Sequence, residues 1–285
     1  MCKITKLSVL LLLLPCCVDA KTLFFSGFET GRVNESTTST IDDTWYGAKT
    51  SCQRDWSYKV VKRGYKHPTS SNPDAAPAPR AGNYMLRFEN RLGDNCVGGN
   101  YRNEIEQRTV MYHGKEYWVG FSWYFPTSWE GEGHNGYIHQ IKCPQGSNYS
   151  ESCPGSLIKP ILQNRGRPWT FTIHQIGSGY AVRKSQWIDF VYHIKLHNSD
   201  GILEVWMDGK KLGRRTGDMS EGGDGVYRVG WRAGQYVQPA FDLVQFFDEF
   251  RIGESYADVV PGQGASRPTV ENVPSIPANL EITKH

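Results

Sequence analysis

The sequence predicts an all-β fold, a single sandwich of two antiparallel sheets. Short segments alternate apolar and polar residues, which is the period of a strand with one buried face. Turn-forming residues punctuate these segments, with 30 glycines and 15 prolines in 285 residues. No segment keeps a 3.6-residue apolar period beyond about two helical turns, and no internal repeat is present. Many short strands without a long helix indicate one β-sandwich.

We expect three parts along the chain. Residues 1–20 have the features of a secretory signal peptide: a basic start, an apolar run over residues 7–14 and the small residue Ala20 at the cleavage position. Residues 21–261 form the folded domain, and residues 262–285 a Pro/Ser-rich flexible tail. No other stretch approaches the about 18 apolar residues that span a bilayer. The mature protein is therefore expected to be secreted, with no membrane partner.

The expected strands share an alternating or β-rich pattern bounded by turn residues. In chain order they cover residues 22–29, 84–89, 101–107, 117–125, 137–142, 170–176, 190–197, 202–207, 226–232 and 241–252. The clearest hairpin joins residues 190–197 to residues 202–207 through Asp200-Gly201, a dipeptide that favours tight turns. Residues 30–55 are rich in Thr, Ser and Asp, and residues 64–82 contain four prolines. Both are predicted to be connecting loops.

The cysteines and the net charge narrow the class of protein. Four cysteines lie in the mature chain, and an even number in an exported protein predicts two disulfides. Three pairings are possible, and we favour Cys143 with Cys153 and Cys52 with Cys96. A zinc site is disfavoured because no CxxC pair is present. Loss of the signal peptide lowers the net charge from +3 to about +2, which disfavours a nucleic-acid partner.

Polar residues recur on one face of three expected strands. Alternation puts each set on one side of its strand: Arg102, Glu104 and Glu106 on the first, Gln140 and Lys142 on the second, Arg228 and Arg232 on the third. Such side chains along the concave face of a curved sheet would form a groove for a polymeric sugar. The high aromatic content, 13%, suits a carbohydrate cleft as well as packing between sheets.

Three short motifs carry a resemblance to a known family. Residues 102–105 (Arg-Asn-Glu-Ile), 139–142 (His-Gln-Ile-Lys) and 227–232 (Tyr-Arg-Val-Gly-Trp-Arg) resemble the signature strands of the β-jelly-roll polysaccharide lyases, which include alginate, heparin and glucuronan lyases. The hairpin of residues 201–209 and the closing strand 247–252 agree in order and spacing. The resemblance covers nearly the whole domain. It implies a jelly-roll sandwich of the concanavalin and lectin type.

The resemblance also implies a reaction, β-elimination from a polymer that contains uronic acid. A positively charged or amide group neutralises the uronate carboxylate, a base removes the C5 proton, and an acid protonates the leaving oxygen. By resemblance, Arg102 and Gln140 hold the carboxylate and Glu104 orients Arg102. The expected partner is an anionic polysaccharide, such as alginate, glucuronan or a glycosaminoglycan, and catalysis requires no cofactor. We expect a monomer.

Two departures from the family pattern leave the base and the acid open. Lys142 stands where the family usually has histidine, and Arg232 where it has the catalytic tyrosine. A lysine serves as base only if burial or neighbouring cations such as Arg228 lower its pKa; otherwise it neutralises the carboxylate. The remaining candidates for the acid or base are His139, Tyr227, Tyr236, Tyr137 and His174.

The roles of these candidates depend on which way their strands face. On regular strands, His139 and Tyr227 would face away from the groove. Glu106, Arg228, Tyr236 and His174 are candidates for substrate binding.

Three other interpretations stay open. Glu29 on the first strand and Asp248 or Glu249 on the last could meet and hold a structural Ca²⁺ through oxygen ligands. Glu104 and Glu106 share a face at about the 5–9 Å that a glycoside hydrolase needs between its carboxylates. A non-catalytic glycan-binding module would explain the two departures as lost chemistry on a retained groove.

Overall fold

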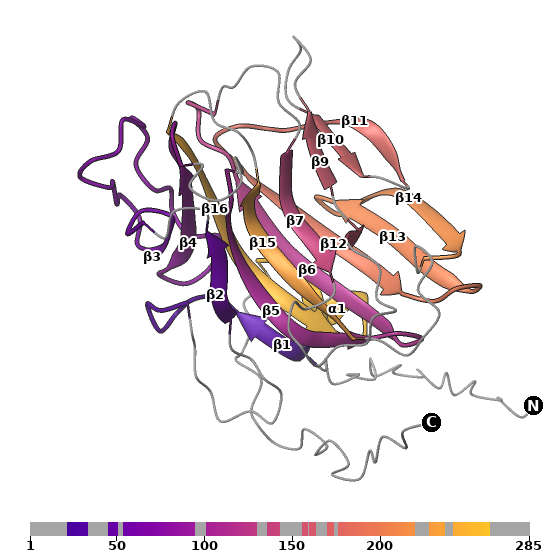
Figure 1. Cartoon of the computed structure of the whole chain (residues 1–285). Coiled ribbons are helices and arrows are strands. Elements are labelled where there is room, and N and C mark those ends of the chain that lie inside the picture. The colour runs from indigo at the N-terminus through magenta and orange to yellow at the C-terminus, as the bar shows by residue number, and fades with distance from the viewer. Residues whose placement is uncertain are drawn as a thin grey trace, which may run out of the picture.

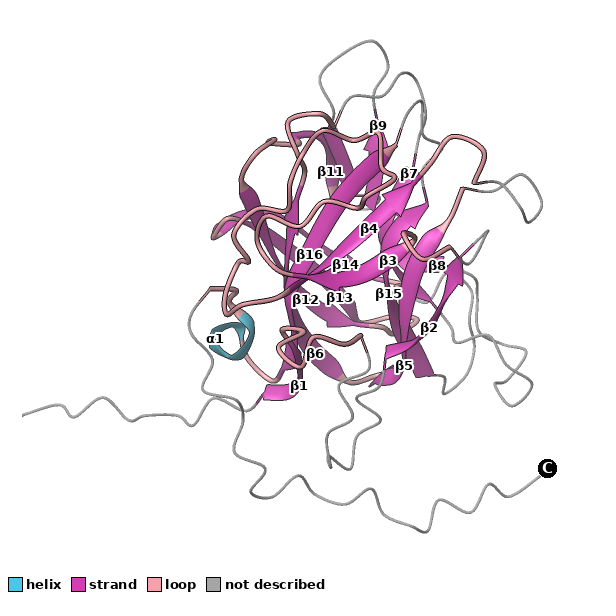
Figure 2. Cartoon of the chain, turned by 90° about the vertical axis from the view of Figure 1, so that its left-hand side faces the viewer, coloured by secondary structure: helices cyan, strands magenta, loops and turns pink. Residues whose placement is uncertain are grey.

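The computed structural model consists of two antiparallel sheets packed face to face (Figure 1 and Figure 2). It describes residues 22–33, 45–50, 54–94, 101–129, 136–142, 156–158, 160–163, 170–173, 176–219, 228–236 and 242–262. In this part of the chain the single helix is the short α1 (Tyr256–Val259), and no helix is long and apolar enough to cross a membrane. The all-β sandwich predicted from alternation is confirmed.

The first sheet, called the back sheet below, has eight strands. Their order is β14-β13-β12-β6-β16-β4-β3, and β1 pairs with β16. The strands are β1 (Thr22–Ser26), β3 (Tyr58–Val61), β4 (Met85–Asn90), β6 (Glu116–Tyr124), β12 (Trp187–Lys195), β13 (Gly201–Met207), β14 (Lys210–Gly217) and β16 (Leu243–Gly253).

The second sheet, called the front sheet below, also has eight strands. Their order is β11-β10-β9-β7-β15-β5-β2, and β8 pairs with β7. The strands are β2 (Trp45–Thr50), β5 (Asn103–Tyr112), β7 (Gly136–Lys142), β8 (Ser156–Ile158), β9 (Pro160–Gln163), β10 (Thr170–Ile173), β11 (Gly177–Ala181) and β15 (Arg228–Tyr236). The three polar motifs of the sequence therefore meet on the adjacent strands β5, β15 and β7.

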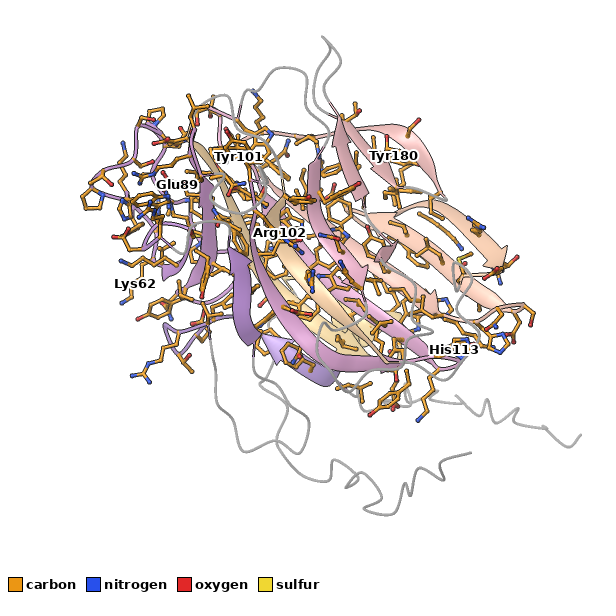
Figure 3. The ribbon with its side chains drawn as sticks, viewed as in Figure 1. Lys62, Glu89, Tyr101, Arg102, His113 and Tyr180 are labelled. Atoms are coloured by element: carbon orange, nitrogen blue, oxygen red, sulfur yellow. The ribbon has the colours of Figure 1, made fainter. Side chains whose placement is uncertain are left out.

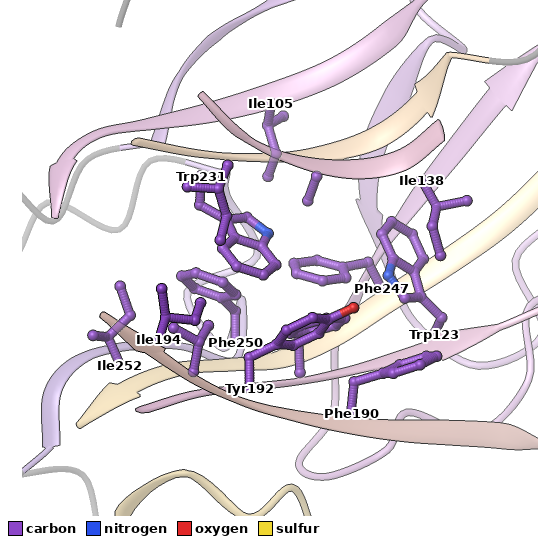
Figure 4. Packing of buried hydrophobic residues seen from close by; sticks show 14 of the residues in the cluster. Ile105, Trp123, Ile138, Phe190, Tyr192, Ile194, Trp231, Phe247, Phe250 and Ile252 are labelled. Carbon is purple, nitrogen blue, oxygen red and sulfur yellow. The ribbon is translucent and has the colours of Figure 1, made fainter. Parts of the chain in front are cut away.

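The space between the sheets is filled by aromatic and aliphatic side chains (Figure 4). Trp123, Phe247, Phe121 and Trp231 are fully buried. Their rings pack closely, with centroids 4.6 Å apart for Trp123 and Phe247 and 5.1 Å for Phe121 and Trp231. Each such side chain contributes about 1.5–3 kcal/mol of burial free energy. Much of the aromatic content thus stabilises the core rather than lining a sugar site.

Ten strands of the described residues match expected segments, and six were not expected: β2, β3, β8, β9, β11 and β14. The expected hairpin of residues 190–207 is confirmed as β12 and β13, with Tyr192 opposite Val205. The opening strand ends at Ser26, two residues before Phe28 adopts a φ of +59°. The strand β14 was missed because its sequence, Lys-Lys-Leu-Gly-Arg-Arg-Thr-Gly, shows no apolar alternation. The strand β2 falls within the loop expected over residues 30–55.

The Pro-rich segment 64–82 is a loop, as predicted, and it covers part of the back sheet. Ala76 of this segment packs with Val61, Met85, Val244 and Phe246 in a small second cluster of buried residues. These contacts join the loop to the back sheet.

Candidate active site

Registers between strands bring the polar residues onto one face of the front sheet. Arg232 of β15 lies opposite Glu106 of β5 on one side and opposite Gln140 of β7 on the other. Gly234 lies opposite Glu104, and Gly230 opposite Lys142. Cross-strand partners share a face, so these residues form one surface. We call it the polar face: Arg102, Glu104, Glu106, Gln140, Lys142, Arg232 and Tyr236.

Glu104 links the two predicted carboxylate-binding residues. Its side chain is only 1% exposed and accepts hydrogen bonds from Arg102 Nε and from Gln140 Nε2, the latter at 2.5 Å. Arg102 is 21% exposed, and Figure 3 shows it over the middle of the front sheet. A guanidinium held through Nε keeps its terminal nitrogens for a bidentate anion. The geometry thus matches a carboxylate clamp that is oriented by Glu104.

Arg232 is a buried residue of the polar face and lies next to Gln140 of the clamp. Its side chain is 1% exposed and Nη2 donates to Glu106 Oε1 at 3.1 Å. Arginine keeps its proton at any ordinary pH, so Arg232 cannot replace a tyrosine as a proton donor. It supplies fixed positive charge and holds Glu106.

Lys142 lies near the charged side chains of the polar face. Burial lowers the pKa of its ammonium group, and the positive charges of Arg232 and Arg102 lower it further, while Glu104 and Glu106 act in the opposite direction. At a given pH, a larger fraction of Lys142 is therefore in the neutral amine form than for an exposed lysine. Gly230 opposite Lys142 adds no side chain to this face. The arrangement equips Lys142 to accept a proton.

Tyr236 and Tyr137 form a pair beside Arg102. Their ring centroids are 5.7 Å apart, and the Arg102 guanidinium lies 5.3 Å from the centroid of Tyr236. A register shift between Ala233 and Tyr236 sets this pairing. Simple alternation along β7 would assign Tyr137 to the core side. Tyr236 is partly exposed, and a phenol is a side chain of the kind that can donate a proton.

His139 lies away from the polar face, in the core. It is fully buried, its Nε2 lies 3.1 Å from Tyr192 Oη, and its ring stacks on Trp231 at 4.9 Å. Burial lowers the pKa of His139 well below its usual value, so the ring is neutral. Alternation along β7 predicted this orientation, and the structure does not bring His139 to the other candidates.

Several sequence candidates fall outside the described residues. These are Tyr227, His174 and the four cysteines, Cys52, Cys96, Cys143 and Cys153. Arg228 begins β15, two residues before Gly230 on the same strand. Their roles and the disulfide pairing stay predictions.

Glu29 and Asp248, the candidate calcium ligands, bind backbone groups of one loop instead. Glu29 accepts hydrogen bonds from the N–H groups of Asn83 and Tyr84. Asp248 is buried and accepts from the N–H of Arg80 at 2.9 Å. Carboxylate oxygens that face N–H donors do not fit a cation. The described ranges contain no cluster of three or more His, Cys, Asp or Glu that could hold a metal, so the structure gives the calcium interpretation no support.

Sequence reasoning missed the positioning role of Gly234. A Cβ at this residue would lie 2.1 Å from the carbonyl oxygen of Asn103 and 2.5 Å from Glu104 Cα, and its φ is +148°. Only glycine allows β15 to approach β5 this closely at Glu104. The expected strand ended at residue 232, two residues before Gly234, so the glycine was not assigned to a strand, where a glycine often marks such an approach.

Comparisons with known proteins agree with this picture. A family profile described as polysaccharide lyase matches residues 63–251. The solved endo-β-1,4-glucuronan lyase from the fungus Trichoderma reesei is similar with a TM-score of 0.60 at 17% identity, over 85% of this chain and all of that one. An alginate lyase matches with a TM-score of 0.46 at 12% identity, over 70% of this chain and 97% of the other. No curated protein sequence matches. The first structure confirms the jelly-roll fold.

Proposed function

This chain belongs to the polysaccharide lyase family, and from that premise we propose that it is a secreted enzyme that cleaves a uronate-containing polysaccharide at the polar face. The observation that carries the proposal is the clamp of Arg102 and Gln140 on Glu104, with Lys142 of lowered pKa beside it. A polymer of uronic acid offers one carboxylate per acidic sugar unit. The clamp provides donors for that carboxylate, and the lysine provides a base.

The reaction would use four residues in distinct roles. Arg102 and Gln140 hold the uronate carboxylate and stabilise the charge that develops as the C5–H bond breaks. Neutral Lys142 takes the C5 proton, the electron pair forms the C4–C5 double bond, and the C4–O bond breaks. Tyr236 protonates the departing oxygen. The products are a new chain end and an unsaturated uronate, with the proton from C5 left on Lys142.

We propose β-1,4-glucuronan as the first substrate to test. The support is the fold shared with an endo-β-1,4-glucuronan lyase along the whole of that protein. Alginate, heparin and ulvan serve as the competing acidic polymers. Their ranking by kcat/KM gives the substrate preference.

The test follows the absorbance near 235 nm, where the unsaturated product absorbs. We expect a rise with at least one acidic polymer, and none with Arg102→Ala, which should keep the melting temperature within a few degrees because Arg102 is partly exposed. The proposal fails if every acidic polymer stays silent while a neutral glucan is cut. It also fails if Arg102→Ala retains full activity.

The hydrolase alternative finds no support at the polar face. It needs one carboxyl group that carries a proton and a second that is free to act on water or sugar. Glu104 already accepts from Arg102 and Gln140, and Glu106 accepts from Arg232. Both carboxylates therefore serve to position cations and an amide.

A further inference from the structure

Side-chain hydrogen bonds join the two sheets where β15 of the front sheet crosses β16 of the back sheet. Gln235 of β15 donates from Nε2 to the carbonyl oxygen of Leu243 on β16 at 3.0 Å. In the opposite direction, Gln245 of β16 donates from Nε2 to the carbonyl oxygen of Gly234 on β15 at 3.1 Å. The two strands are therefore fixed to each other at two backbone positions.

A third amide makes the same kind of connection from the neighbouring strand. Asn103, the first residue of β5, donates from Nδ2 to the carbonyl oxygen of Glu89 and to Asn90 Oδ1 on β4. Asn103 lies directly opposite Gln235 across β5 and β15. We call Asn103, Gln235 and Gln245 the amide layer. All three side chains are buried, at 2% exposure or less.

The two sheets approach each other at this end of the sandwich. Cα atoms of β4 come within 8 Å of Cα atoms of both β5 and β15, whereas stacked sheets are typically about 10 Å apart. Large rings such as Trp123 and Phe247 fill much of the remaining interior. Burying an amide costs free energy unless it is hydrogen-bonded, and apolar side chains would fill the same space without that cost. What the amides add is direction, because a hydrogen bond fixes one backbone relative to another.

The layer lies immediately behind the carboxylate clamp. Asn103 stands between Arg102 and Glu104 in the chain, and strand alternation places neighbours on opposite faces of the sheet. The amide of Asn103 therefore points toward β4 while Glu104 holds Arg102 on the polar face. Any displacement of the Asn103 backbone would move both clamp residues with it.

The other two amides act on the strand that carries the phenol. Gln235 directly precedes Tyr236, and Gln245 holds the carbonyl group of Gly234, the residue opposite Glu104. The backbone on both sides of the Gln235 amide is thus fixed to the back sheet. This is also the place where β15 makes its close approach to β5.

We propose that the amide layer positions the reacting groups of the polar face, by fixing β5 and β15 to the back sheet so that the clamp and Tyr236 keep one geometry. This inference rests on the proposed function for the reaction that the layer serves. Elimination needs the clamp, Lys142 and the phenol on one sugar unit at the same time. A displacement of about 1 Å can lower a rate about 100-fold. The amides face away from the substrate, so they are positioning residues.

The first test measures steady-state kinetics on glucuronan at 235 nm. Asn103→Leu, Gln235→Met and Gln245→Met keep the approximate size of each side chain but remove its donor. We expect kcat to fall about tenfold in each variant and KM to stay within about twofold, because many sugar units contribute to binding and only one reacts. The control is Ser122→Ala, which removes a buried hydrogen bond of 2.7 Å to Asp189 on the back sheet. It should lower the melting temperature and leave the kcat of the folded protein unchanged.

The pH profile separates positioning from a loss of stability. Burial lowers the pKa of Lys142, and the positive charges of Arg232 and Arg102 lower it further. When the layer variants let these guanidinium groups move away, the pKa of Lys142 rises, and the rising limb of kcat/KM moves to higher pH. Ser122→Ala should keep the wild-type profile.

Hydrogen–deuterium exchange tests the layer without any substrate. Backbone amides of residues 101–106 and 234–236 should exchange about tenfold faster in the layer variants than in the wild type, because one hydrogen bond fewer opposes local opening. Exchange in β12 and β13 should stay at the wild-type rate. The same comparison with Ser122→Ala should show no change at residues 101–106 and 234–236.

The two proposals fail in different ways. A loss of kcat no larger than that of Ser122→Ala overturns the role of the amide layer, and so does unchanged exchange at residues 101–106 and 234–236. Absence of the 235 nm product from the wild type with every polymer refutes the proposed function instead, and the exchange rates then decide whether the layer fixes the two strands. Because each of the three substitutions removes a different bond, the other two carry the test where one variant does not fold.

Discussion

Substitution of Glu104 by glutamine tests the carboxylate clamp most directly. Glu104 is 1% exposed and accepts from Arg102 Nε and Gln140 Nε2. Glutamine keeps the shape but loses the charge and turns one acceptor into a donor that faces an N–H group. A hydrogen bond to a charged group contributes about 1.5–3 kcal/mol. Because about 1.4 kcal/mol changes a rate tenfold, kcat/KM should fall about 10- to 100-fold.

The assay follows initial rates at 235 nm over a range of glucuronan concentrations, with thermal unfolding in parallel. The matched control is Asp189→Asn on the back sheet, where the carboxylate binds Arg80 Nε at 2.9 Å and Nη2 at 2.8 Å. That variant breaks a similar pair and should lower stability without lowering the activity of the folded protein. The reasoning is refuted if Glu104→Gln stays within about twofold of the wild type or loses no more activity than the control.

Three further predictions follow from the same geometry. Lys142→Arg keeps the positive charge but cannot release a proton near neutral pH, so kcat should fall about 100-fold or more if Lys142 is the base. Near-normal activity of this variant would show that Lys142 only neutralises the substrate carboxylate. In the wild type, kcat/KM should rise with pH through the lowered pKa of Lys142. Gly234→Ala places a Cβ against Asn103 and Glu104 and should lower the free energy of unfolding, measured by urea titration, by about 1–3 kcal/mol. The loss should exceed that of the control Gly179→Ala, because Gly179 also has a positive φ of +85° but has open space around it. Equal losses for the two variants would contradict the close approach of β15 to β5. Burial and the neighbouring Glu249 raise the pKa of Asp248 well above its usual value, so the folded state favours the protonated carboxyl group. The contribution of this protonated group to the free energy of unfolding is therefore complete below the unfolded pKa of about 3.9 and is lost as pH rises through the folded pKa. Asp248→Asn should remove that part of the pH dependence, and parallel stability curves for the two proteins between pH 4 and 8 would argue against it.

Alternation along single strands was readable from the sequence because it depends only on local backbone geometry. It placed Arg102, Glu104 and Glu106 on one face and His139 on the opposite face of its strand, and the structure agrees. The hairpin of β12 and β13 followed from its turn residues for the same reason. The family motifs added the role of the clamp.

Contacts between distant segments were decided only by the tertiary structure. The pairing of Glu106 with Arg232 joins residues 126 positions apart, and the register shift in β15 brings Tyr236 to Tyr137 against simple alternation. The lowered pKa of Lys142 depends on burial and on two guanidinium groups, from Arg232 of β15 and from Arg102 just before β5. Strand period is a property of neighbouring residues, whereas register, burial and electrostatic environment arise only when β5, β7 and β15 lie side by side.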